Sequence, residues 1–315
     1  MNTATKHTLS LGGLFVTLAG AVLFSTKAIF VKLAFGQVRV DAVTLLAARM
    51  VFALPFYLVA AFLLSRQKDN VRFTVREWVY VSAIGILGYY LSSLFDFIGL
   101  QYISAGLERL ILFLYPSFAV FINAFYFKQR ISGIQKTALL LTYLGIGIAY
   151  FGELSVDANN PDFYFGSLMV LLCAATYSVY LVGSGRIIPR VGANKFTAYA
   201  MLAATVGVLG HFLVVNAGKG VALSPDIWQY GVLLAVFSTV LPSFMLSQGL
   251  KSIGSNNVAV ISGIGPVSTI VQAHFVLGEK IFFTQVLGTL IVIVGVLLIG
   301  WKREVPLTEP KPGPV

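Results

Sequence analysis

The sequence predicts an all-α membrane protein in which ten transmembrane helices form two inverted repeats of five helices each. The first observation is composition, since the 315 residues are 57% hydrophobic and only 11% charged, with a mean hydropathy of +0.86. A soluble domain carries about 25% charged residues, so this chain needs lipid as its outer solvent. The other two observations are a series of long apolar segments and an internal repeat.

Ten segments are apolar over about the 20 residues that a helix needs to cross a bilayer. They lie near residues 10–34, 41–64, 78–100, 105–127, 134–152, 164–184, 194–215, 227–250, 255–277 and 284–301. The first segment is predicted to be a helix and not a signal peptide, because its apolar run is longer than a signal core and no small-residue cleavage site follows. The Pro-rich tail at 303–315 is predicted to be disordered.

The repeat relates residues 99–145 to residues 249–295 without a gap. Matching identities include Gly99 with Gly249, Ile103 with Ile253, Pro116 with Pro266 and Gly145 with Gly295. An internal repeat in a very apolar chain is typical of transporters built from two related halves. Residues 1–152 and 153–302 are therefore predicted to be the two halves. Each half has an odd number of spans, so the second half enters the membrane from the opposite side.

The basic residues orient this arrangement. With the N-terminus inside, fifteen of the 22 Lys and Arg residues fall on inner segments, four on outer segments and three within spans. This bias follows the positive-inside rule and predicts that both termini are cytoplasmic. It also accounts for the net charge of +10 without a nucleic-acid partner, because the excess faces anionic lipid.

Two stretches carry a resemblance to a known family. "GLQYISAGLERLILFLYPSFAVFINAFYFKQRIS" and "SNNVAVISGIGPVSTIVQAHFVLGEKIFFTQVLGTLIVIVGVLLI" resemble the two repeats of EamA-type transporters of the drug/metabolite transporter (DMT) superfamily. Pro116 and Pro266 match the prolines of that pattern, and Gly278-Glu279-Lys280 matches its polar ending. The first half has Lys128-Gln129-Arg130 there instead, without the acidic member. The resemblance implies ten helices, cytoplasmic termini, a central cavity and movement of small metabolites, often outward.

Ionisable residues inside the spans are the main candidates for a substrate or ion pathway, because charges in hydrocarbon are costly and usually face a cavity or a partner. They are Lys27, Arg49, Asp96, Glu108 and Arg109, all predicted in the outer half of the membrane. The positions that match them in the second half are uncharged, so a purely architectural role for these charges is less favoured.

These five residues also have structural interpretations. Asp96 is expected to pair with Arg109, and such a pair serves equally well to hold two helices together. Glu108 has no evident partner one helical turn away, so it is the expected titrating group if protons are used at all. Its position in the first turn of a helix is an alternative reason for its presence.

Further candidates are weaker. Tyr115 is a candidate for an aromatic cavity wall, and His274 for a proton relay, although an interfacial packing role is favoured for the histidine. Pro116 and Pro266 are hinge candidates, because proline interrupts the backbone ladder of a helix. The single cysteine, Cys173, excludes an intrachain disulfide and a multi-cysteine metal site.

No nucleotide-binding loop, H-E-x-x-H motif or cysteine cluster is present in the sequence. We therefore expect no cofactor, no metal and no enzyme activity. The predicted function is a secondary transporter, in the export direction, of a small metabolite such as an amino acid. Proton coupling is left open, and lipid and the small molecule are the only expected partners besides protons. A membrane-embedded lipid-modifying enzyme and an ion channel are the alternatives. Substrate identity and oligomeric state do not follow from the sequence.

Overall fold

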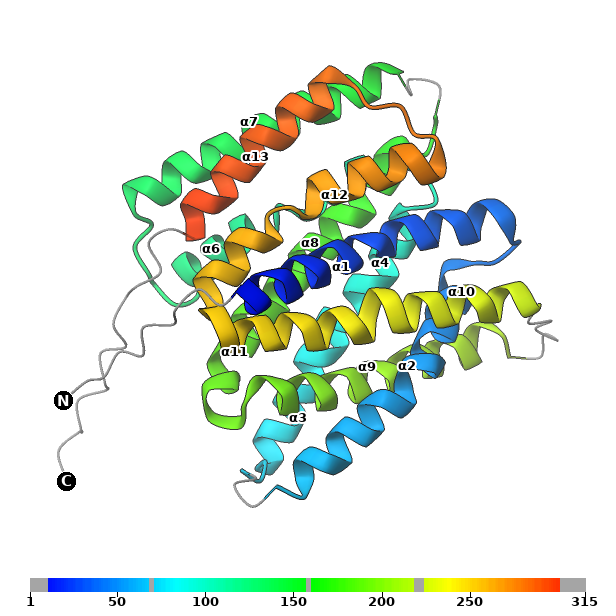
Figure 1. Ribbon diagram of the computed structural model, residues 1–315, viewed down its shortest axis with the longest axis vertical. Coiled ribbons are helices and arrows are strands. Elements are labelled where there is room, and N and C mark those ends of the chain that lie inside the picture. The colour runs from blue at the N-terminus through cyan, green and yellow to red at the C-terminus, as the bar shows by residue number, and fades with distance from the viewer. Residues whose placement is uncertain (1–10, 68–70, 157–159, 218–223, 301–315) are drawn as a thin grey trace.

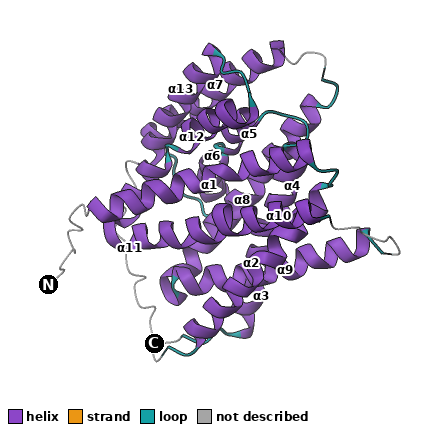
Figure 2. Cartoon of the chain, turned by 45° about the vertical axis from the view of Figure 1, so that its right-hand side comes forward, coloured by secondary structure: helices purple, strands orange, loops and turns teal. Residues whose placement is uncertain are grey.

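The computed structural model describes residues 11–67, 71–156, 160–217 and 224–300, and the regular structure within these ranges is entirely helical (Figures 1 and 2). This confirms the predicted all-α class. The expected disorder of the tail at 303–315 concerns residues outside these ranges.

The helices of the first half follow the predicted spans closely. They are α1 (Leu11–Gln37), α2 (Ala42–Ser65), α3 (Val75–Gly85) continued by the π-helix η1 (Ile86–Leu91) and by α4 (Ser92–Gly99), α5 (Ala105–Leu112), α6 (Tyr115–Phe125) and α7 (Gly133–Val156). Polar side chains cap several N-termini: the Asp41 carboxylate accepts from the Thr44 amide at 2.9 Å and the Ser104 hydroxyl from the Leu107 amide at 3.0 Å. Such caps fix where α2 and α5 begin.

The second half departs from the predicted boundaries at two places. Its helices are α8 (Phe163–Val191), α9 (Ala193–Val215), α10 (Pro225–Ala235) continued by the π-helix η2 (Val236–Val240) and by α11 (Leu241–Ser262), α12 (Gly265–Gln272) continued by the π-helix η3 (Ala273–Leu277), and α13 (Phe283–Gly300). First, α8 runs beyond the predicted end at 184 and stops only at Gly192, whose φ of 83° is accessible to glycine. Second, residues 251–254, which separate the predicted spans 227–250 and 255–277, belong to α11, and the chain leaves the helix only after Ser262.

Eight helices within the described residues are long and apolar enough to cross a membrane, and Phe283–Leu298 is a shorter apolar helix. Large apolar side chains point outward from the bundle, among them Phe125, Val206 and Phe275, which are 75%, 74% and 81% exposed. Surface of this kind is stable only against lipid. The protein is therefore an integral multi-pass membrane protein.

The helix α1 lies antiparallel to α10, η2 and α11. A Cβ on Gly13 would lie 2.8 Å from the Ile253 side chain, the Thr26 and Ser238 hydroxyls are 3.1 Å apart, and the Tyr230 hydroxyl donates to the Gln37 side chain at 2.5 Å. At one edge of the bundle α13 packs along α7, and the two lie side by side in Figure 1. Small residues allow these backbones to approach.

Several close approaches occur in pairs that the repeat relates to each other. A Cβ on Gly145 would lie 2.6 Å from the Gly288 carbonyl oxygen, and one on Gly295 would lie 2.8 Å from the Ala138 carbonyl oxygen. The two contacts are equivalent under the repeat, because Gly145 matches Gly295 and Ala138 matches Gly288 at a shift of 150 residues.

The contacts of α1 and α8 are paired in the same way. Gly13 faces Ile253, while Gly166 faces Ile103; Gly249 faces Thr17, while Gly99 faces Val170. Gly13 and Gly166 are matched in the sequence at a shift of 153 and Ile103 and Ile253 at a shift of 150. The two halves therefore meet through equivalent surfaces.

Helix irregularities also recur at matching positions. The chain leaves helical geometry at Phe113–Leu114 between α5 and α6, and at Gly263–Ile264 between α11 and α12. The π-helices η1 and η2 begin 150 residues apart. Pro116 and Pro266, predicted as hinges inside spans, lie in the first turns of α6 and α12, where a missing amide proton costs no intrahelical bond.

A bulky residue at Gly145 is expected to separate α7 from α13. Gly145→Leu should destabilise the protein by about 1–3 kcal/mol, because its side chain would overlap the Gly288 backbone. Gly147→Leu is the matched control, since a Cβ on Gly147 meets nothing within 4 Å. Thermal unfolding of the purified variants measures both, and equal melting temperatures would contradict the tight α7–α13 contact.

Candidate functional site

A buried group of three charges joins α1, α4 and α5. The Lys27 ammonium lies 2.7 Å from Oδ2 of Asp96 and 3.8 Å from Oε1 of Glu108, and both carboxyl side chains are fully buried. We call Lys27, Asp96 and Glu108 the charged triad. Two carboxylates face one ammonium in it, so the triad carries an excess negative charge when both are ionised.

The triad differs from the expected pairing. Asp96 pairs with Lys27 of α1, and no ion pair joins Asp96 to Arg109 among the described residues. Glu108, which was expected to have no partner within its own helix, forms an ion pair with Lys27 of α1. Since adjacent helical residues point about 100° apart, Glu108 and Arg109 face different neighbours.

Arg49 ties three helical segments together through uncharged partners. Its Nε donates to the Thr239 hydroxyl at 2.8 Å and its Nη1 to the Ser93 hydroxyl at 3.2 Å, and the guanidinium lies over the Phe97 ring. Thr239 belongs to η2 and Ser93 to α4, so Arg49 connects the π-helix of the second half to the first half. The Thr239 hydroxyl in turn donates to the Leu234 carbonyl at 2.8 Å.

Arg109 is buried without a counter-ion among the described residues. It is 7% exposed, its Nε has no hydrogen-bond partner, and no described carboxylate oxygen lies within ion-pair distance. Its guanidinium lies 5.6 Å from the centres of the Phe24 and Phe113 rings. It also lies against Gly265 at the start of α12, where a Cβ would come within 2.8 Å of Nη2.

Aromatic residues surround this region on the side of α8. Tyr115 is half-buried and meets Tyr177 edge to face, Tyr177 stacks on Tyr180, and the Tyr180 and Tyr89 hydroxyls are 2.8 Å apart. Tyr115 is thus part of an aromatic cluster, and it lines neither of the two cavities described below. Cys173 of α8 is buried, with its thiol 3.2 Å from the Ser92 hydroxyl.

His274 lies apart from the charged triad. It is exposed on η3, and its Nδ1 contacts the carbonyl oxygen of Glu279 at 2.8 Å. The Glu279 side chain accepts from the Ala105 amide at 3.0 Å, so the acidic residue of the polar ending stabilises the start of α5. The proton-relay and packing roles considered for His274 both stay predictions.

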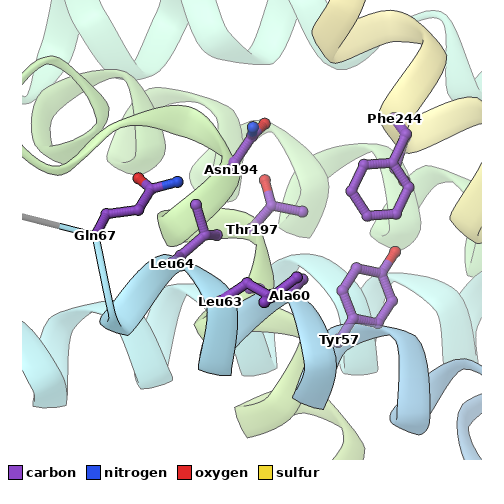
Figure 3. Close-up of a pocket in the computed structure, with 10 residues that line it drawn as sticks. Tyr57, Ala60, Leu63, Leu64, Gln67, Asn194, Thr197 and Phe244 are labelled. Atoms are coloured by element: carbon purple, nitrogen blue, oxygen red, sulfur yellow. The ribbon is translucent and has the colours of Figure 1, made fainter. Parts of the chain in front are cut away.

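A cavity of about 240 Å³ opens at the end of the bundle where α2 finishes. Figure 3 shows Tyr57 and Leu64 of α2, with Gln67 just beyond its end, on one side of the cavity, and Thr197 of α9 and Phe244 of α11 opposite. The Tyr57 hydroxyl, at the deep end, is buried and without a hydrogen-bond partner among the described residues. Tyr57 lies two turns from Arg49 on α2, so the cavity leads toward the charged residues.

A second cavity, of about 300 Å³, lies at the opposite end of the bundle. Polar and charged side chains from several helices line it, namely Lys32, Tyr102, Ser104, Glu153 and Glu279. The Lys32 ammonium donates to the Ile103 carbonyl at 2.9 Å. None of the triad residues lines either of these two cavities, and both carboxyl groups of the triad are fully buried.

Sequence reasoning missed Thr239, Ser93 and Tyr57. Hydroxyl groups inside apolar spans are common and carry no pattern of their own, so only the contacts with Arg49 and the cavity single these residues out. No group of three or more His, Cys, Asp and Glu side chains within the described ranges could hold a metal ion.

Comparison with known proteins agrees with a bundle of apolar helices around buried charges. The model of the EamA-like transporter family matches residues 11–151 and 164–301. The chain belongs to the EamA-like transporter family, and with it to the drug/metabolite transporter superfamily. This confirms the resemblance seen in the sequence and defines the chain as a membrane transporter.

Relatives from distant organisms are similar over most of their length. "Uncharacterized transporter YcbK" of Bacillus subtilis (strain 168) is 31% identical over 281 residues, covering 88% of each chain. An "Uncharacterized transporter" of Archaeoglobus fulgidus is 22% identical over 284 residues, covering 90% of this chain and 95% of its own. A solved structure, "Crystal structure of protein", has the same fold with a TM-score of 0.61 at 18% identity, covering 91% of this chain and 95% of that one.

Proposed function

We propose that this transporter is a secondary carrier that exports a small metabolite, such as an amino acid, by alternating access. The charged triad is its central element, because it lies buried between two cavities at opposite ends of the bundle. A carrier needs a site that is closed to both sides in its intermediate conformation. Exposure of the triad first to one cavity and then to the other would move a bound solute across the membrane.

Under this proposal the chain is a ten-span protein of two inverted repeats, at 1–152 and 153–302. The paired contacts across α7 and α13, and those of α1 and α8, support this architecture, since each contact has a counterpart 150 to 153 residues away. The matching helix breaks and π-helices support it as well. Inverted halves can exchange conformations about a site between them, and the breaks before Pro116 and Pro266 are the proposed hinges.

In the proposed orientation both termini lie on the cytoplasmic side of a bacterial inner membrane. The cavity at Tyr57, at the end of α2, then faces the cytoplasm. The support for this orientation is the distribution of Lys and Arg, which favours the segments at that end. Reporter fusions near residues 70 and 315 should read inside, and one near residue 159 outside. An inside result at residue 159 would contradict the inverted architecture.

The triad also offers a mechanism for coupling to protons. With both carboxylates ionised it holds one excess negative charge, which either a proton or a substrate ammonium group can neutralise. Glu108 is the proposed proton carrier and Asp96 the fixed partner of Lys27, because Asp96 lies closer to the ammonium. Because a proton and the substrate ammonium group would compete for the same site, the carrier would exchange one for the other across the membrane. An inward proton gradient would then drive export of the substrate.

Transport by the purified chain in proteoliposomes tests the proposal. Vesicles loaded with a metabolite mixture are followed by mass spectrometry, with and without a pH gradient. We expect saturable release of a restricted set of solutes, accelerated by the same solute outside. Release that does not saturate would instead indicate a channel, and chemical change of a lipid would indicate an enzyme.

A further inference from the structure

Arg109 presents an unusual electrostatic situation. A buried guanidinium normally has a carboxylate partner, because desolvation of an unpaired charge is costly. Lys27 takes both nearby carboxylates, and Arg109 is left with two aromatic rings and no anion among the described residues. The five buried charges in this region are three cations and two anions, so one positive charge is uncompensated.

The surroundings of Arg109 also favour an anion. Its guanidinium lies against Gly265, in the first turn of the eight-residue helix α12. The N-terminal end of a helix carries a partial positive charge and presents amide groups. One turn further along the same face, the Thr269 hydroxyl is fully buried and has no hydrogen-bond partner in the described part of the chain. Two buried groups beside the first turn of α12, the Arg109 Nε and the Thr269 hydroxyl, therefore lack a hydrogen-bond partner among the described residues.

We propose that Arg109, the first turn of α12 and Thr269 form the subsite for the carboxylate of the transported solute. This rests on the proposed function and narrows its substrate to solutes that carry a carboxylate. Glycine at position 265 lets the guanidinium lie directly against this turn, because a Cβ there would come within 2.8 Å of Nη2. A planar guanidinium suits a carboxylate through two parallel hydrogen bonds. Glu108 precedes Arg109 directly, so the carboxylate would be held next to the triad.

Acetate is the probe for this subsite, with acetamide as its uncharged counterpart. Thermal unfolding of the full-length protein in lipid nanodiscs is measured with each probe at equal ionic strength. Acetate should raise the melting temperature of the unchanged protein more than acetamide does. Arg109→Met should abolish the acetate response, and Thr269→Val, which keeps every charge, should reduce it. Arg130→Gln, at an exposed arginine, should respond like the unchanged protein.

The unliganded variants provide a second readout. Without acetate, Arg109→Met should melt a few degrees higher than the unchanged protein, since it removes an unpaired buried charge; a purely structural arginine would lower it. In vesicles, loss of the guanidinium should slow exchange of the transported carboxylate roughly tenfold or more. An acetate response that persists in both Arg109→Met and Thr269→Val, or that acetamide equals, would overturn the subsite. The melting measurement needs no transport, so failure of the proposed carrier function would appear separately.

Discussion

Lys27→Met is expected to destabilise the protein by about 3–5 kcal/mol, because it leaves two buried carboxyl groups without their counter-ion. The variant should accumulate less in the membrane and melt at a lower temperature. Lys136→Met, at an exposed lysine, should leave both quantities unchanged. The geometry of the charged triad therefore predicts that removal of Lys27 lowers abundance as well as transport.

Compensation provides the sharper form of this test. Adding Asp96→Asn to Lys27→Met should restore part of the lost stability, since it removes the charge closest to the missing ammonium. The double variant should therefore lose less stability than the sum of the losses in the two single variants. Strictly additive effects of the two substitutions would contradict an energetic link between Lys27 and Asp96.

Glu108→Gln is expected to abolish the dependence of transport on a pH gradient while solute exchange at equal pH continues. The amide keeps the size of the side chain but cannot gain or lose a proton. Asp96→Asn, in contrast, should impair exchange itself, because it breaks the 2.7 Å pair with Lys27. Initial rates in proteoliposomes at equal and unequal pH separate the two effects.

The Glu108 assignment fails if Glu108→Gln retains the full response to the pH gradient. If the unchanged protein shows no such response, the carrier is a facilitator and the triad has another role in it. The Lys27→Met prediction is independent of this outcome, since it concerns stability alone.

The class of the protein could be predicted from the sequence because hydropathy and the repeat are properties of long segments. The all-helical membrane class and the family were confirmed, and most helix ends lie within a few residues of the predicted ones. The predicted end of α8 was wrong by seven residues, since the helix continues through both arginines, Arg186 and Arg190, and stops only at Gly192. The boundary between the eighth and ninth predicted spans was also wrong, since α11 continues to Ser262 and α12 begins at Gly265. The ten-span inverted arrangement stays a prediction, because eight helices in the described ranges meet the length and hydropathy of a span.

The partners of the buried charges could not be predicted in the same way. Pairing depends on the direction in which each side chain points and on which helix crosses in front of it. The sequence suggested Asp96 with Arg109 from their closeness along the chain, whereas packing of α1 against α5 brings Lys27 to both carboxylates. The π-helices also carry no recognisable sequence signal, although η2 supplies the hydroxyl that holds Arg49. The charged positions were therefore found, and their connections were not.

The central claim is that the two cavities open alternately around the charged triad. Distances between pairs of spin labels test it most directly, with Leu63 and Phe244 labelled across the inner cavity, and Gln101 and Phe283 across the outer one. A Cys173→Ala background, checked for transport, removes the native thiol. In proteoliposomes, conditions that lengthen one distance should shorten the other. Distances that change together, or a transporting protein in which neither changes, would contradict alternating access around the triad.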